Sequence, residues 1–84
     1  MNIKILGPGC PNCQMVEAIA REAAAELRAD ATFEKVKEIE EIKKYPIMAT
    51  PGLVINEELV CGGRIPSKAE VTGWITSALS REGK

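Results

Sequence analysis

The junction between a short β-prone run and a long amphipathic helix constrains the fold of this chain most. Ile3, Ile5 and Leu6 predict a strand over 2–6, which the Gly-Pro-Gly loop at 7–9 ends. Pro11 suits the first turn of a helix expected over about 11–29, because the N–H that proline lacks has no partner there. Apolar residues recur along it at helical spacing: Val16, Ile19, Ala20, Ala23 and Leu27. Its charged residues are expected mostly on the other face: Glu17, Arg21, Glu22 and Arg28.

The rest of the chain predicts two more helices and three more strands. Phe33 and Val36 anchor a strand over 31–36, which completes a parallel βαβ unit with a right-handed crossover. A short charged helix is expected over 38–44, where Tyr45-Pro46 ends it. Apolar runs at 53–55 and 59–61 flank a polar turn at 56–58 and predict a hairpin. A capping box at 67–70 begins the last helix, whose apolar stripe is Val71, Trp74, Ile75, Ala78 and Leu79.

The resulting order β-α-β-α-β-β-α predicts an α/β fold with a four-stranded mixed sheet packed by helices. A chain of 84 residues suits a single domain over 1–84, with a flexible tail at about 81–84. The only aromatic residues are Phe33, Tyr45 and Trp74, so the core must be largely aliphatic. Trp74, Met15 and Met48 are expected to pack in that core.

Composition excludes several classes of function. The chain has no histidine, which removes His-based acid/base catalysis, Cys-His pairs and imidazole zinc sites. Eleven basic and twelve acidic residues are interspersed, which argues against nucleic-acid binding. No apolar run is long enough for a signal peptide or a membrane span. We therefore expect a cytoplasmic monomer that binds neither nucleic acid nor a membrane.

The cysteine pair Cys10-Pro11-Asn12-Cys13 carries the chemistry. Cys10 lies at or next to the helix N-cap, where unpaired N–H groups and the helix dipole favour a thiolate and lower the thiol pKa. We expect Cys10 to attack a substrate disulfide, and Cys13 to resolve the mixed disulfide and leave an intramolecular Cys10–Cys13 disulfide. We expect no bound cofactor, because this redox-active disulfide carries the electrons itself. The third cysteine, Cys61, is expected to be a small buried hydrophobe.

A second motif precedes the predicted hairpin, at 45–55. Pro51 could be a turn residue, or the Thr50–Pro51 peptide bond could be cis. A cis bond there would leave the Thr50 N–H and C=O pointing outward, where an extended substrate segment could pair with them.

Residues 9–13 and 45–55 together resemble the thioredoxin/glutaredoxin superfamily, and residues 62–67 extend the resemblance. The closest resemblance is to the small thioredoxin-like redox-active disulfide proteins of bacteria and archaea, a truncated thioredoxin-like fold lacking the first strand and helix. It implies a cis Thr50–Pro51 bond, protein-disulfide reductase activity, disulfide-containing protein substrates and a flavoprotein thioredoxin reductase as electron donor. It also implies a set of substrate-binding residues: Pro11, Asn12, Thr50 and Pro51.

Three positions depart from the thioredoxin pattern. Gly9 replaces a tryptophan, Lys4 replaces a buried aspartate that assists proton transfer, and Gly52 replaces the usual residue after the proline. Cys-Pro-x-Cys is also typical of glutaredoxins, but no charged cluster predicts a glutathione site.

Two alternatives remain open. The loop at 7–17 resembles the copper-binding loop of heavy-metal-associated domains, so the cysteine pair could hold Cu(I) in a soft-metal chaperone. Pro8 stands where those domains carry a methionine, and no strand is predicted after the last helix. A non-catalytic interaction module on the same scaffold would leave the cysteine pair unused.

Overall fold

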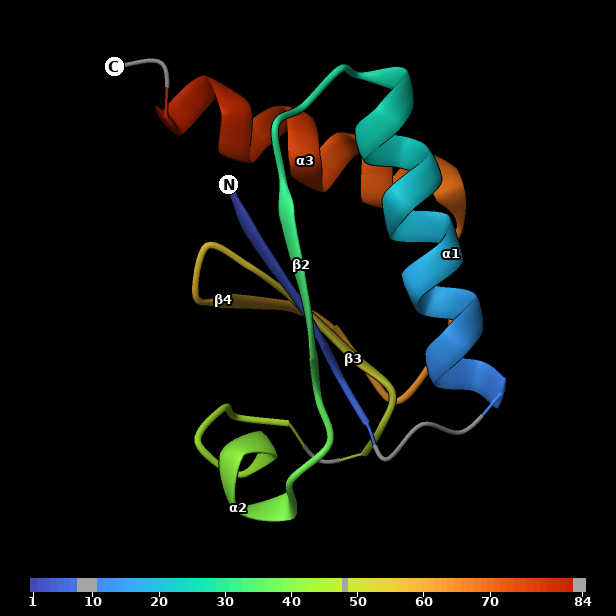
Figure 1. Ribbon diagram of the computed structural model, residues 1–84, viewed down its shortest axis with the longest axis vertical. Coiled ribbons are helices and arrows are strands. Elements are labelled where there is room, and N and C mark those ends of the chain that lie inside the picture. The colour runs from blue at the N-terminus through green and yellow to red at the C-terminus, as the bar shows by residue number, and fades with distance from the viewer. Residues whose placement is uncertain (8–10, 48, 83–84) are drawn as a thin grey trace.

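The computed structural model describes residues 1–7, 11–47 and 49–82. Seven elements follow one another in the predicted order (Figure 1). The strands are β1 (Asn2–Leu6), β2 (Thr32–Val36), β3 (Gly52–Ile55) and β4 (Glu58–Gly62). The helices are α1 (Pro11–Glu26), α2 (Ile39–Ile42) and α3 (Lys68–Glu82).

The four strands form one mixed sheet in the order β2-β1-β3-β4. β1 and β2 are parallel, and Ile5 of β1 pairs with Lys35. β3 is antiparallel to both β1 and β4, so the hairpin joins the βαβ unit through β1. The predicted α/β fold is therefore confirmed.

The two faces of the sheet pack against different helices. Ile3 and Ile5 of β1 lie in the larger core cluster with the apolar sides of α1 and α3. Leu6 lies on the other face with Val54 and with Ile42 of α2. In Figure 1, α1 and α3 accordingly lie together, away from α2. Lys4, which alternates with Ile3 and Ile5, belongs to the α2 face.

Helix α1 ends at Glu26, three residues before the predicted end. Arg28 has φ 54°, in the left-handed region, and the N–H of Ala29 donates to the carbonyl of Ala24 at 2.9 Å. The left-handed residue at the end of α1 lets the last carbonyls of the helix accept hydrogen bonds and directs the chain toward β2. Apolar periodicity continues to Leu27, so it could not reveal the end.

The hairpin turn has two residues instead of the predicted three. Asn56 and Glu57 have φ 50° and 67°, as a type I′ turn requires, and Ile55 pairs with Glu58. The N–H of Asn2 donates to the Asn56 side chain at 2.9 Å, which ties the turn to β1.

The capping box of α3 forms as predicted. The Glu70 N–H donates to the Ser67 hydroxyl at 3.1 Å, and the Ser67 N–H donates to the Glu70 carboxylate at 3.0 Å. The helix continues through residues 81–82, which were predicted as tail, and Arg81 pairs with Glu58 at 3.0 Å.

Four side-chain predictions have different outcomes. Trp74 packs against the larger core cluster and Cys61 is buried, as expected. Met15 is 52% exposed, so its predicted core role is wrong: its place in α1 turns it away from the sheet. Met48 lies outside the described residues.

Candidate active site

The predicted site lies where β1 and β2 end and α1 begins. In open α/β sheets, ligands bind at the carboxyl ends of parallel strands, and the first N–H groups of a helix have no partner within the helix. Pro11 and Asn12 are exposed in the first turn of α1, whereas Cys13 is only 4% exposed. Cys10 lies outside the described residues.

Gly7 provides the space that Cys13 occupies. A Cβ atom on Gly7 would overlap the Sγ of Cys13 and lie 3.9 Å from the Cβ of Thr50. The Gly7 N–H donates to the carbonyl of Val36 at 2.9 Å, which holds Gly7 against the end of β2. The structure therefore brings Cys13 and Thr50, 37 positions apart in the sequence, to the same glycine.

Thr50 is exposed, while Pro51 is buried, and the peptide bond between them is cis. The carbonyl of Pro51 accepts a hydrogen bond from the Gly63 N–H at 2.9 Å. Within the described part of the chain, neither the N–H nor the C=O of Thr50 has a hydrogen-bond partner.

The glycine after Pro51 has a packing explanation. A Cβ on Gly52 would overlap Cδ1 of Ile47 and lie 3.3 Å from the Leu6 side chain. Gly52 thus allows the loop that carries Thr50 to lie close over β1.

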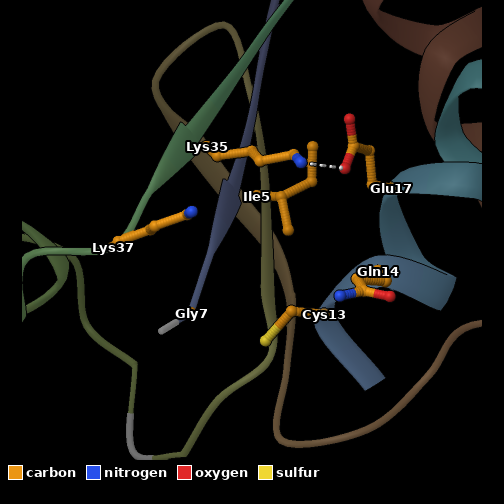
Figure 2. A pocket seen from close by; sticks show the side chains of 7 residues that line it. All are labelled: Ile5, Gly7, Cys13, Gln14, Glu17, Lys35 and Lys37. Atoms are coloured by element: carbon orange, nitrogen blue, oxygen red, sulfur yellow. Dashed lines mark ion pairs between the residues drawn. The ribbon is translucent and has the colours of Figure 1, made fainter. Parts of the chain in front are cut away.

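A small pocket opens beside Cys13 (Figure 2). Its walls come from three elements: Ile5 and Gly7 at the end of β1, Cys13, Gln14 and Glu17 from α1, and Lys35 and Lys37 at the end of β2. Sequence reasoning missed the glutamate and both lysines, because it assigned the charged residues of α1 to the solvent face. The available signals were the spacing of Glu17 four residues after Cys13 and the neighbouring register of Ile5 and Lys35.

Glu17 is the pocket's carboxylate, and its side chain is only 14% exposed. Lys35 lies 3.2 Å from one carboxylate oxygen, and Arg21 donates to the other at 2.9 Å. Burial alone would raise the pKa of Glu17, but the hydrogen bonds from Arg21 and Lys35 outweigh it and hold the pKa below its usual range. Glu17 is therefore an anion at neutral pH.

Lys4 points to the opposite face of the sheet. Its ammonium lies 2.6 Å from the Glu57 carboxylate and donates to the Tyr45 hydroxyl at 3.1 Å. The Glu57 and Tyr45 hydrogen bonds raise the pKa of Lys4, and the Lys4 hydrogen bond lowers the pKa of Glu57. This position therefore supplies a structural ion pair and no proton carrier for the cysteine pocket.

Cys61 lies on β4 and does not line the pocket. Its side chain is 7% exposed, and its thiol is 3.8 Å from the Arg64 carbonyl. Burial raises the pKa of this thiol, which disfavours the nucleophilic thiolate.

Among residues 1–7, 11–47 and 49–82, no group of three or more histidine, cysteine or acidic side chains could hold a metal ion. The described part of the chain also contains no helix long and apolar enough to cross a membrane.

A family model described as a thioredoxin domain matches residues 1–76. This chain belongs to the thioredoxin family. A thioredoxin of Methanothermobacter thermautotrophicus is 51% identical over 71 residues, covering 84% of this chain and 92% of that protein. A thioredoxin of Methanocaldococcus jannaschii is 37% identical over 82 residues, covering 98% and 92% of the two chains.

Members of the thioredoxin family are thiol–disulfide oxidoreductases, and this chain is one of that family. The match confirms the resemblance to the thioredoxin superfamily that residues 9–13 and 45–55 indicated. The copper-chaperone alternative finds no support, because the matching family and both relatives are thioredoxins.

Proposed function

We propose that this protein reduces disulfide bonds in other proteins through its Cys10–Cys13 dithiol. The single observation that carries the proposal is the placement of Cys13 in the first turn of α1, buried beside Gly7 and next to the exposed Thr50. A thiol held there follows Cys10 by three residues in the sequence and lies near Thr50, while solvent does not reach it freely.

The reaction proceeds by two thiol–disulfide exchanges. The Cys10 thiolate attacks one sulfur of the substrate disulfide, and the other substrate sulfur leaves as a thiolate. Cys13 then attacks the Cys10 sulfur, forms the Cys10–Cys13 disulfide and releases the second substrate thiolate. Protons taken up by the two leaving thiolates balance those lost by the two cysteines. No bound cofactor is needed.

The substrate segment lies across the Thr50–Pro51 loop and the start of α1. Thr50 offers its N–H and C=O to the substrate backbone, and the exposed Pro11 and Asn12 contact the substrate from the first turn of α1. A shallow hollow lies beside Thr50 and receives an apolar side chain of the substrate; it is lined by Ile39, Ile42, Lys43, Ile47 and Ala49.

The oxidised protein needs an electron donor to complete a cycle. A flavoprotein thioredoxin reductase is the donor that family membership favours. We place the protein in the cytoplasm as a monomer, where a reducing environment keeps the buried Cys61 as a thiol.

Trapping of the mixed disulfide tests the proposal. Cys13→Ser removes the resolving thiol, so a covalent complex with a disulfide substrate such as insulin should accumulate on a non-reducing gel. Cys10→Ser should form no such complex and should lose insulin reduction. Equal trapping by both variants, or by neither, would contradict the assigned roles.

A further inference from the structure

We propose that the pocket beside Cys13 binds an acidic side chain of the protein substrate, so that disulfides flanked by aspartate or glutamate are preferred. This inference rests on the proposed function and names a class of substrate for it. It is carried by the charges around the pocket, whose lining includes two lysines and one glutamate (Figure 2).

Lys37 supplies a cation to the pocket that the described part of the chain does not neutralise. It follows β2 directly, is exposed and lines the pocket. Within residues 1–7, 11–47 and 49–82, no carboxylate lies within ion-pair distance of its ammonium group. Figure 2 shows the side chains of Lys35 and Lys37 extending from β2 in the direction of α1. An anion that enters between β2 and α1 would therefore gain an ion pair with Lys37.

Glu17 is the only carboxylate among the lining residues that the structure describes, and both of its oxygens are engaged. Lys35 lies 3.2 Å from one oxygen, and Arg21 donates to the other at 2.9 Å. Three cations thus surround one carboxylate at this pocket. The whole chain has the opposite balance, with eleven basic and twelve acidic residues. A local excess of positive charge favours an anion over a neutral or cationic group.

The size of the pocket selects a small group. The pocket measures about 70 Å³, and one water molecule needs roughly 15 Å³ of such space. The pocket therefore holds about four heavy atoms, which is enough for a carboxylate group and too few for an aromatic ring. The side-chain amide of Gln14, exposed on α1, lines the same pocket and can donate a further hydrogen bond.

The second exchange of the proposed function brings substrate side chains to this pocket. When Cys13 attacks the Cys10 sulfur, the substrate sulfur is still bonded to Cys10, about 2 Å away. The substrate sulfur and the Cys13 sulfur are then roughly 4–5 Å apart. A residue next to the substrate cysteine has its Cα about 3.8 Å farther along the chain. Its side chain can therefore reach a pocket that Cys13 itself lines.

Matched peptide disulfides test this preference. Symmetric disulfide dimers of short peptides carry Asp, Asn or Lys directly before or directly after a single cysteine. Reduced protein in a Cys61→Ala background releases the peptide thiol, which is measured by chromatography after an acid quench. Each rate constant is divided by that for uncharged dithiothreitol, which removes differences in intrinsic reactivity. In at least one of the two positions, the Asp peptide should react about three- to fivefold faster than the Asn peptide, as expected for an ion pair near the surface. The Lys peptide should be slowest.

Lys37 should control the ratio of the Asp rate to the Asn rate. Lys37→Gln should at least halve this ratio, whereas Lys37→Arg keeps the positive charge and should retain it. Glu17→Gln removes the pocket's own anion and should raise the ratio, because an incoming carboxylate is no longer repelled. Added NaCl should lower the ratio in the wild type, since salt screens exposed charges.

Lys44→Gln provides the matched control. It changes the net charge as Lys37→Gln does, but Lys44 pairs with Glu41 at 2.6 Å and does not line the pocket, so the ratio should stay at the wild-type value. The inference would be overturned by a wild type without preference for Asp, by an unchanged ratio in Lys37→Gln, by an equal loss in Lys44→Gln, or by a lower ratio in Glu17→Gln. A wild-type protein that releases thiol from none of the peptides would instead overturn the proposed function.

Discussion

Gly7 and Cys13 share one space: the Sγ of Cys13 occupies the position where a Cβ on residue 7 would stand. No side chain larger than hydrogen fits at residue 7 unless the thiol moves. The end of β1 and the first turn of α1 are thereby fixed against each other at the point where the chemistry is expected.

Gly7→Ala should therefore destabilise the protein by about 1–3 kcal/mol, the usual effect of an extra methyl group in a packed site. It should also slow disulfide reduction, because the thiol is displaced. Urea unfolding gives the stability, and insulin turbidity gives the rate.

A double-mutant cycle identifies the cause. In a Cys13→Ala background the overlapping sulfur is absent, so Gly7→Ala should destabilise the protein less than it does in the wild type. Equal destabilisation in both backgrounds would show that the thiol is not the group that excludes a side chain.

Cys61 should be dispensable for disulfide exchange. Burial raises its pKa and it does not line the pocket, so Cys61→Ala should leave insulin reduction unchanged within experimental error. Iodoacetamide should label this thiol slowly at pH 8 in the folded protein and rapidly in urea. An activity loss as large as that of Cys10→Ser would contradict its structural role.

Changes in the hollow beside Thr50 should alter the KM for protein disulfides and leave the reduction of small disulfides unchanged. Ile39 lines this hollow and is 56% exposed, so Ile39→Asp should remove about 1 kcal/mol of apolar contact and raise the KM for a protein disulfide roughly fivefold. Reduction of a small aromatic disulfide should not change. Ser77→Asp, an exposed position on α3, provides the control. Parallel effects on both substrates would argue against docking in the hollow.

The stabilisation that Glu70 gives at the start of α3 should decrease in acid. The hydrogen bonds from Arg64, then those from Ser67, lower the pKa of Glu70 to about 2 from its usual 4.5. A carboxyl with a lowered pKa stabilises the fold above its unfolded-state value and loses that effect as pH falls through its folded-state value. Glu70→Gln should therefore lower Tm at pH 7, with a difference that narrows between pH 5 and 2. If the Tm difference between the wild type and Glu70→Gln stayed constant over this range, the ionised Glu70 carboxylate would not be the source of the stabilisation.

The order of the elements was predictable because each one has a local signal. Apolar spacing marks the helices, Gly7 follows the first strand, and Pro46 follows the short second helix. The Ser67–Glu70 box forms both of its hydrogen bonds. The exact ends were less predictable. Arg28 ends α1 in a left-handed conformation, which an arginine does not predict.

The site was only partly predictable, because it depends on contacts between distant segments. The two motifs were visible in the sequence, and the structure places Thr50 near Gly7 and Cys13. Glu17 was assigned to the solvent face because helical periodicity separates apolar from charged residues. Only the structure shows that this carboxylate pairs with Lys35 at a pocket that Cys13 also lines.

The reduction potential of the Cys10–Cys13 pair tests the central claim most directly. The metal-free Cys61→Ala protein is equilibrated with mixtures of reduced and oxidised dithiothreitol, and its remaining thiols are counted. The account predicts one reversible two-electron couple at about −270 mV, as in thioredoxin. Failure to form a reversible disulfide, together with tight stoichiometric Cu(I) binding, would contradict it.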